Sequence, residues 1–316
     1  MVDLKLKLPD GFLDEEERCG YLVSKKMKEV WAVELDLFAE FDRVCRKYDI
    51  QYFASSGTML GAVRHHGFIP WDDDMDVMMM RDQYEKLCKI AEKEFSYPYF
   101  FQTEYTDPGS LRGHAQLRNS MTTGGLVEEI KNKVPINQGI FFDIFPLDAI
   151  PDDELERKRF LNKIMHMKQK LWKKANFTIR YLPARTRWKR PIKYLLHGVL
   201  SLLIKPEDIK MEFRHFEQAC QQYNDQETKY VDLISFRGND KFKRRRCHFK
   251  TRIYVPFEFL QMPICKDYDA ALTNIFGNWH KLVKGTSLHG GVIFDTGRPY
   301  TDYLKGKLSH DGNNFN

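Results

Sequence analysis

The residues with the clearest chemical potential are four aspartates crowded into the five positions 72–76, just before an apolar run. In a strand over residues 74–80, alternate side chains share a face. Asp74 and Asp76 would then lie side by side, while Met75 and Val77 enter the core. Two neighbouring carboxylates raise each other's pKa unless a cation relieves their repulsion. Hard oxygen ligands of this kind suit Mg²⁺ or Mn²⁺.

A calcium-binding EF-hand loop is an alternative interpretation of this stretch. Asp72, Asp74 and Asp76 match its first, third and fifth positions. However, Val77 stands where the loop needs glycine, and Gln83 where it needs glutamate, so this interpretation fails. The simpler alternative is a solvated acidic turn, which the aspartates alone favour about as much as a metal site.

A possible phosphate site precedes the aspartates. The sequence "SSGT" at 55–58 reads as a turn between a strand and a helix. The backbone N–H groups of Ser56, Gly57 and Thr58 could cradle a phosphate at the start of that helix. Arg64 and His65, further along, could bind phosphate or sugar hydroxyls.

A further carboxylate, Asp143, stands alone within the apolar stretch "GIFFDIFPL". A charge in a buried strand is costly unless it is paired or binds a metal. Arg112 or Arg118 is the alternative, purely structural partner. Together, these neighbours favour a metal and phosphate site over an acidic turn.

Composition indicates a globular chain with a mildly basic surface. Of the 316 residues, 42% are hydrophobic and 30% are charged, with a formal net charge of +6. This charge suits an anionic ligand but does not by itself indicate nucleic-acid binding. We find neither an N-terminal signal peptide nor an apolar run of about 18 residues. Six scattered cysteines without a CxxC pair favour a reducing compartment. We therefore expect a cytoplasmic protein.

The pattern of apolar residues predicts the elements that would position these groups. Strands are expected at 50–57, 74–80, 98–103, 113–118 and 138–151, with Pro146 ending the last. Helices are expected at 22–48, 58–67, 81–95, 152–175 and 206–224. Composition becomes more charged after Pro151, which predicts a core at 1–151 and a mainly helical extension at 152–316.

Four motifs together resemble the LicD/fukutin-related family. They are "SSGTMLGAVRHHGFIPWDDDMDV" (55–77), "LRNSMTT" (117–123), "FFDIFPLDAIP" (141–151) and "DYDAALTNIFGNWHKL" (267–282). The resemblance implies an α+β, nucleotidyltransferase-like fold with a mixed sheet flanked by helices. Asn278 and His280 depart from the last motif, where the family often has aspartate and methionine. The absence of the membrane anchor and zinc loop of eukaryotic members indicates a bacterial-type member.

By this resemblance, the chain transfers a phospho-alcohol from a CDP-activated donor to a sugar hydroxyl and releases CMP. CDP-choline is the favoured donor, and a cell-surface glycan or its lipid-linked precursor is the acceptor. Asp74 and Asp76 match the family's metal-binding pair and Asp143 its third carboxylate, which is also the best candidate base. Asp73 has the opposite strand parity and is not expected to bind metal, whereas Asp72 is expected to tether the loop.

Supporting roles follow for the remaining candidates. Ser56, Gly57 and Thr58 would hold phosphate oxygens, while Arg64, His65 and Arg118 would supply positive charge. Two alternatives remain open. The chain could transfer a nucleotide rather than release it, or it could bind metal or glycan without catalysis.

Two basic segments lie outside these motifs. In 185–205, basic residues precede an apolar stretch, which is typical either of a core helix or of a peripheral helix at the inner face of the membrane. We slightly favour the core helix. The run "KFKRRRCHFK" (241–250) lacks interleaved aromatic residues, so we do not expect nucleic-acid binding.

Overall fold

The computed structural model describes residues 1–178, 190–285 and 291–306. Its helices are α1 (Lys25–Lys47), α2 (Ser56–His65), α3 (Arg81–Glu94), α4 (Val127–Lys131), α5 (Glu154–Thr178), α6 (Arg190–Leu203), α7 (Pro206–Cys220), α8 (Tyr268–Phe276) and α9 (Tyr300–Leu304). The strands are β1 (Glu16–Arg18), β2 (Tyr21–Val23), β3 (Phe53–Ala54), β4 (Asp76–Met80), β5 (Tyr99–Gln102), β6 (Ala115–Asn119), β7 (Thr123–Leu126), β8 (Ile140–Ile150), β9 (Tyr230–Asp232), β10 (Arg244–Arg245), β11 (Arg252–Phe257), β12 (Leu260–Cys265) and β13 (Val292–Asp295).

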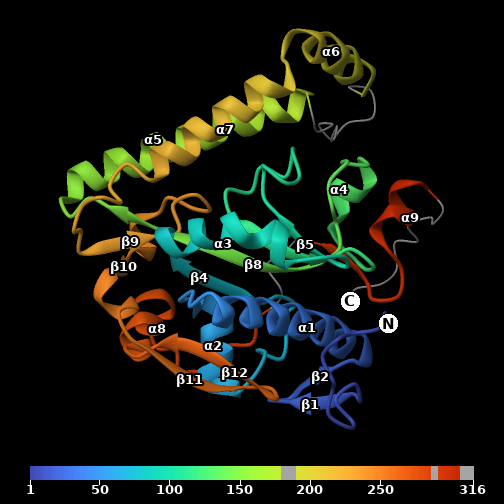
Figure 1. Cartoon of the computed structure of the whole chain (residues 1–316), viewed down its shortest axis with the longest axis vertical. Helices are drawn as coiled ribbons and strands as arrows, with labels where there is room; N and C mark the ends of the chain where they lie inside the picture. Colours follow the sequence, from blue (N-terminus) through green and yellow to red (C-terminus); the bar gives the residue numbers. More distant parts are fainter. Residues whose placement is uncertain (179–189, 286–290, 307–316) are drawn as a thin grey trace.

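A seven-stranded mixed sheet carries the fold, in the order β10-β9-β8-β4-β3, with β5 and β6 joined to it through β8. Strands β4 and β8 are parallel, while β3 is antiparallel to β4. In Figure 1, α5 and α7 lie above the sheet and α1 and α2 lie below it. The expected α+β fold with a mixed sheet flanked by helices is therefore confirmed.

The long strand β8 runs through Pro146, so the prediction that this proline ends the strand is wrong. On one side, β8 pairs with β4 over residues 143–147. On its other side, β6 pairs with residues 140–144 and β9 with residues 148–150. Residues 145–147 therefore fall between two partner strands, where proline's missing N–H breaks no ladder hydrogen bond on that side.

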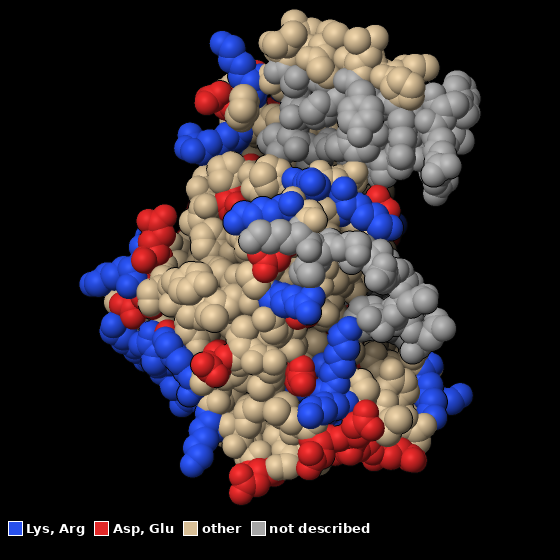
Figure 2. Space-filling view, turned by 90° about the vertical axis from the view of Figure 1, so that its right-hand side faces the viewer, with Lys and Arg blue, Asp and Glu red and all other residues tan. Residues whose placement is uncertain are grey.

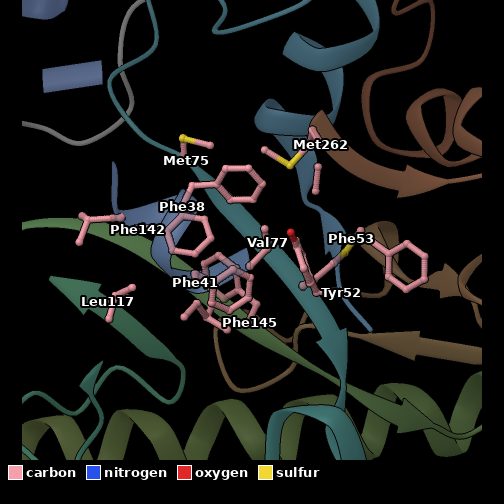
Figure 3. Close-up of a cluster of buried hydrophobic side chains, with 14 of the residues drawn as sticks. Phe38, Phe41, Tyr52, Phe53, Met75, Val77, Leu117, Phe142, Phe145 and Met262 are labelled. Atoms are coloured by element: carbon pink, nitrogen blue, oxygen red, sulfur yellow. The ribbon is translucent and has the colours of Figure 1, made fainter. Parts of the chain in front are cut away.

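Aromatic packing under the sheet explains why α1 forms and where it lies. Apolar residues recur at helical spacing, and Ser24 caps the helix by accepting a hydrogen bond from the Met27 backbone N–H at 3.3 Å. The ring of Phe41 meets those of Tyr52 and Phe142 edge-on, with centroids 4.7 and 5.0 Å apart. Figure 3 shows this cluster around β4 and β8. The two strands that carry the acidic residues are thus anchored in the main core.

Most of the expected elements are present with shifted ends. Helices α1, α3, α5 and α7 match predictions, as do strands β5 and β6. The strand expected at 50–57 is limited to Phe53–Ala54, because α2 begins at Ser56. Strands β9 and β10 bring residues beyond 151 into the same sheet. A domain boundary at 151 stays a prediction.

A close contact fixes α2 against the loop that leads to the aspartates. A Cβ atom at Gly61 would lie 2.4 Å from the backbone oxygen of Gly67, so only glycine fits there. The same loop is held by Glu258, whose backbone N–H donates to the His66 oxygen at 2.7 Å. Arg18 in turn donates to both carboxylate oxygens of Glu258, at 2.5 and 2.8 Å.

Candidate active site

Hydrogen bonds between the β3–α2 turn and β4 set the position of Asp76. Ala54 pairs with Val77 across the two strands. The Ser55 backbone N–H donates to the Asp76 carbonyl at 2.9 Å, and the Asp76 N–H donates to the Thr58 hydroxyl at 2.8 Å. Thr58 therefore braces the start of β4. It does not line the cavity described below, where it was expected to hold phosphate.

The parallel register of β4 and β8 places Asp76 opposite Asp143. The Asp143 backbone N–H also donates to the carbonyl of Met75 at 3.0 Å, just before β4. A cavity of about 860 Å³ opens at this point of the sheet, and Asp72, Asp74, Asp76 and Asp143 all line it. The three predicted metal ligands thus face one cavity, although they come from two strands and a loop.

The segment before β4 is a loop, so the predicted strand begins two residues late, at Asp76. Burial still alternates as expected. Asp73 and Met75 are buried, whereas Asp74 and Asp76 are partly exposed. In this loop, Asp72, Asp73 and Asp74 each offer a carboxylate oxygen within 4.8 Å of the others. The alternation of side chains along a strand is therefore not enough to exclude Asp73 as a metal ligand.

The loop is anchored through its backbone. Trp31 of α1 donates its indole N–H to the Asp72 carbonyl at 3.1 Å. The Trp31 ring stacks on Phe68, with centroids 4.5 Å apart and planes within 4° of parallel. Gly57 faces the same loop, since a Cβ atom there would lie 3.0 Å from the Asp72 carboxylate. The loop's shape is therefore built from α1 and α2 together.

The chemistry of these donors fits a divalent cation. Anionic oxygens are the ligands that Mg²⁺ and Mn²⁺ prefer, and several carboxylates around one cavity need positive charge for stability. Asp74, Asp76 and Asp143 would hold such an ion, with Asp72 and Asp73 close by. This assignment of ligands stays a prediction.

A row of side chains on β6 supports Asp143 from behind. Gln116 donates its amide N–H to the Asp143 carboxylate at 2.5 Å, and Arg118 donates to the Gln116 oxygen. Arg118 also donates to the Gly139 carbonyl at 2.6 Å and to the Gln102 side-chain oxygen at 2.6 Å. Only 1% of Arg118 is exposed, and it does not line the cavity. Arg118 therefore positions Gln116 rather than lying where it could touch a substrate.

His114, on the same face of this segment, was missed by the sequence reasoning. Its Nε2 lies 3.5 Å from an Asp143 oxygen. Burial lowers the pKa of His114. Burial also raises the pKa of Asp143, but His114 and the Gln116 hydrogen bond outweigh it and lower that pKa overall. The spacing of His114, Gln116 and Arg118, two residues apart, was the available signal, because such residues share one face of a strand.

Glu34 of α1 is a second missed residue. It is 1% exposed, and its Oε2 atom has no hydrogen-bond partner among the described residues. Burial raises its pKa well above the usual value, and the negative charges of residues 72–74 and Asp76 raise it further. The available signal was an acidic residue inside the apolar helical stretch "WAVELDLF". Glu34 thus adds a buried carboxyl to the acidic cluster.

The residues expected to bind phosphate divide into two groups. Ser56, Gly57 and Arg64 line the cavity, but His65 does not. The Arg64 Nε–H donates to His65 Nε2 at 3.0 Å, and its Nη1 donates to the Trp279 carbonyl at 3.0 Å. Burial, together with Arg64 and other nearby cations, lowers the pKa of His65 to about 4. His65 is therefore neutral at pH 7 and orients Arg64 instead of supplying charge.

Residues beyond 151 also line the cavity. Arg237, Lys241 and Lys281 bring positive charge, and the Arg237 guanidinium lies 5.3 and 4.7 Å from the ring centroids of Phe236 and Phe242. None of these was predicted, because the sequence offers no spacing rule that joins them to the aspartates. The cavity is thus lined both by a cluster of carboxylates and by cationic side chains.

The late motif contributes to the cavity lining as well. Asn278 and Trp279 line the cavity. Trp279 is 7% exposed and donates its indole N–H to Asp269 at 3.1 Å. His280 is exposed and stacks on the Trp279 ring with centroids 3.8 Å apart. Most of the other lining side chains are apolar or aromatic: Leu60, Ile69, Trp71, Phe145, Phe236, Phe242, Ile275, Phe276 and Val283.

Magnesium should stabilise the protein, and this stabilisation should depend on Asp76. A ligand at 100 times its Kd stabilises the folded state by about 2.7 kcal/mol, which corresponds to several degrees in Tm. We expect Asp76→Asn to lose the Mg²⁺-dependent rise in Tm, measured by calorimetry. The exposed Asp225→Asn should keep it. An unchanged Mg²⁺ response in Asp76→Asn would show that the ion binds elsewhere.

Replacing Glu34 should stabilise the metal-free protein in a pH-dependent way. Because the folded-state pKa is raised, the contribution of Glu34 to stability is fully present below its unfolded pKa and declines as pH rises above it. In EDTA, we therefore expect the stability advantage of Glu34→Gln over the wild type, measured by urea unfolding, to grow between pH 5 and pH 8. The exposed Glu92→Gln serves as control. If the difference in unfolding free energy between Glu34→Gln and the wild type did not change with pH, the raised pKa of Glu34 would be contradicted.

Comparisons with known proteins identify relatives of this chain. Residues 49–178 match the model of the LicD/FKTN/FKRP nucleotidyltransferase domain. The lipopolysaccharide cholinephosphotransferase LicD of Haemophilus influenzae is 28% identical over 265 residues, which cover 81% of this chain and 92% of that protein. An uncharacterized protein of Rickettsia prowazekii is 31% identical over 144 residues, covering 45% of this chain and 50% of that protein. The chain is therefore similar to the LicD/FKTN/FKRP nucleotidyltransferase domain over residues 49–178, and to the Haemophilus influenzae LicD protein over most of its length.

Proposed function

We propose that the chain transfers phosphocholine from CDP-choline to a sugar hydroxyl of a lipopolysaccharide-type glycan and releases CMP. The observation that carries this proposal is the cavity itself, which is lined by Asp74, Asp76 and Asp143 and also by Arg64, Arg237 and other cations. A CDP-alcohol is a diphosphate, so it requires positive charge along its phosphates. The printed function of the Haemophilus influenzae relative supports the same reaction class.

The proposed reaction is a displacement at phosphorus. The acceptor hydroxyl oxygen attacks the phosphorus that carries choline, and the bond from that phosphorus to the bridging oxygen of CMP breaks. CMP leaves with the bond's electron pair, and the hydroxyl proton passes to Asp143. Asp143 can accept this proton because its carboxylate lines the cavity and is held in place by Gln116. A divalent cation, when bound, would neutralise charge on the diphosphate.

Side chains of this chain would hold the reactants in place. Arg64 is held by Trp279 and His65, so its guanidinium is presented to the cavity in a fixed position. Arg237 and Lys241, which also line the cavity, would neutralise the phosphates. Gln116 would keep the Asp143 carboxylate oriented toward the acceptor oxygen. Such preorganised charge is the main source of rate enhancement in phosphoryl transfer.

The apolar character of the cavity favours choline over a polyol as the transferred alcohol. A quaternary ammonium donates no conventional hydrogen bonds and is bound by aromatic faces and nearby negative charge. Trp71 and Phe276 line the cavity together with the carboxylates. A polyol such as ribitol would need polar partners for each hydroxyl, and burying hydroxyls without them is costly.

Turnover of CDP-choline tests the proposal. With a lipopolysaccharide acceptor and Mg²⁺, we expect CMP release matched by choline incorporated into the glycan. Turnover should be faster than with CDP-ribitol or CDP-glycerol. Asp74→Asn should lower kcat by about 100-fold or more, because it removes a carboxylate that would hold the divalent cation. The exposed Asp225→Asn should retain activity. Transfer of the nucleotide to the acceptor, or full activity in EDTA, would contradict the proposal.

A further inference from the structure

Helix α6 exposes a continuous apolar stripe. Its large aliphatic residues recur every three or four positions, which places them on one helical face. They are Ile192 (54% exposed), Leu195 (71%), Leu196 (46%), Val199 (50%), Leu202 (85%) and Leu203 (71%). The preferred sequence interpretation, a core helix, is therefore wrong for this face. A contiguous apolar surface of this kind marks an interaction site.

The position of α6 suits contact with an extended surface. Figure 1 places the helix at the far end of the molecule, beyond the α5–α7 pair and away from α2 and α8 at the cavity. In Figure 2, the described atoms at this end are mostly uncharged. Within the described ranges, no helix is both long and apolar enough to cross a membrane. The stripe can therefore lie along a surface but does not span one.

The charge of the helix distinguishes between two candidate occupants. Helix α6 contains the basic residues Arg190 and Lys193 and no acidic residue. A second copy of the helix would offer these two basic residues no acidic partner, because it has the same composition. An anionic lipid surface has the complementary charge and accepts the leucine side chains among its acyl chains.

We propose that α6 docks the protein on an anionic membrane surface, with its axis in the plane of the interface and its apolar stripe inserted. Docking would hold the protein on the membrane that carries a lipid-anchored glycan, and this part of the inference rests on the proposed function. The docking itself depends only on α6. Variants at α6 are therefore expected to leave CMP release with a water-soluble glycan acceptor unchanged.

Vesicle flotation of the purified full chain tests the docking without measuring activity. We expect binding to vesicles of phosphatidylcholine with about 30% phosphatidylglycerol, and weaker binding to pure phosphatidylcholine. Binding should also weaken at about 1 M salt, where the Debye length falls to about 3 Å. The double variant Leu195→Glu/Leu202→Glu should lower the partition coefficient by about tenfold or more, because two carboxylates enter the interface.

Leu155→Glu is the matched control, since Leu155 is a similarly exposed leucine, at 66%, on the distant start of α5. It should bind vesicles like the wild type, and circular dichroism should show that both variants fold. Equal binding by the α6 variant, or no binding by the wild type, would overturn the proposal. A wild-type dimer that the α6 substitutions convert to monomers, by light scattering, would assign the stripe to a second copy instead. Loss of transferase activity alone would leave the flotation result intact.

Discussion

Repulsion between crowded carboxylates is the constraint on which the rest of the site depends. Oxygens of Asp72, Asp73 and Asp74 lie within 4.8 Å of one another. At that distance, two unit charges repel by about 3 kcal/mol at an effective dielectric constant of about 20. Asp76 and the buried Glu34 add to the same cluster. The fold must hold these groups together against their repulsion. A divalent cation would relieve this repulsion, and the relief would favour its binding.

Two sets of contacts hold the acidic residues in place, one acting on their backbone and the other on the Asp143 side chain. Parallel pairing of β4 with β8 sets Asp76 opposite Asp143, and the Trp31 indole fixes the loop before β4. On the neighbouring strand β6, Arg118 holds Gln116, and Gln116 holds Asp143. Because these supports are buried, they lose little conformational freedom when a ligand binds. The result is a cavity lined both by firmly held carboxylates and by cationic side chains, which suits a metal-bound diphosphate.

Local patterns predicted the parts of this site that depend on neighbouring residues. The alternation expected from residue 74 onward grouped Asp74 with Asp76, and an isolated charge in an apolar strand singled out Asp143. All three line the same cavity, although Asp74 lies before β4. Long-range packing was not readable in this way. Arg118 was mistaken for a ligand-binding residue because burial is invisible in one basic residue, and Arg237 was missed because it reaches the cavity from far along the chain. The prediction for Pro146 was wrong because a strand can contain this proline only where no partner strand needs its N–H. That depends on where β6 and β9 end along β8.

The central claim is that carboxylates from β4, β8 and the loop before β4 act as one metal site. Crystals grown with Mn²⁺ and CMP test it most directly, because anomalous scattering locates manganese without reference to activity. The account predicts a manganese peak in direct contact with Asp74, Asp76 and Asp143, with the CMP phosphate beside it. A manganese ion held only by Asp72 and Asp73, or none in the cavity, would contradict it.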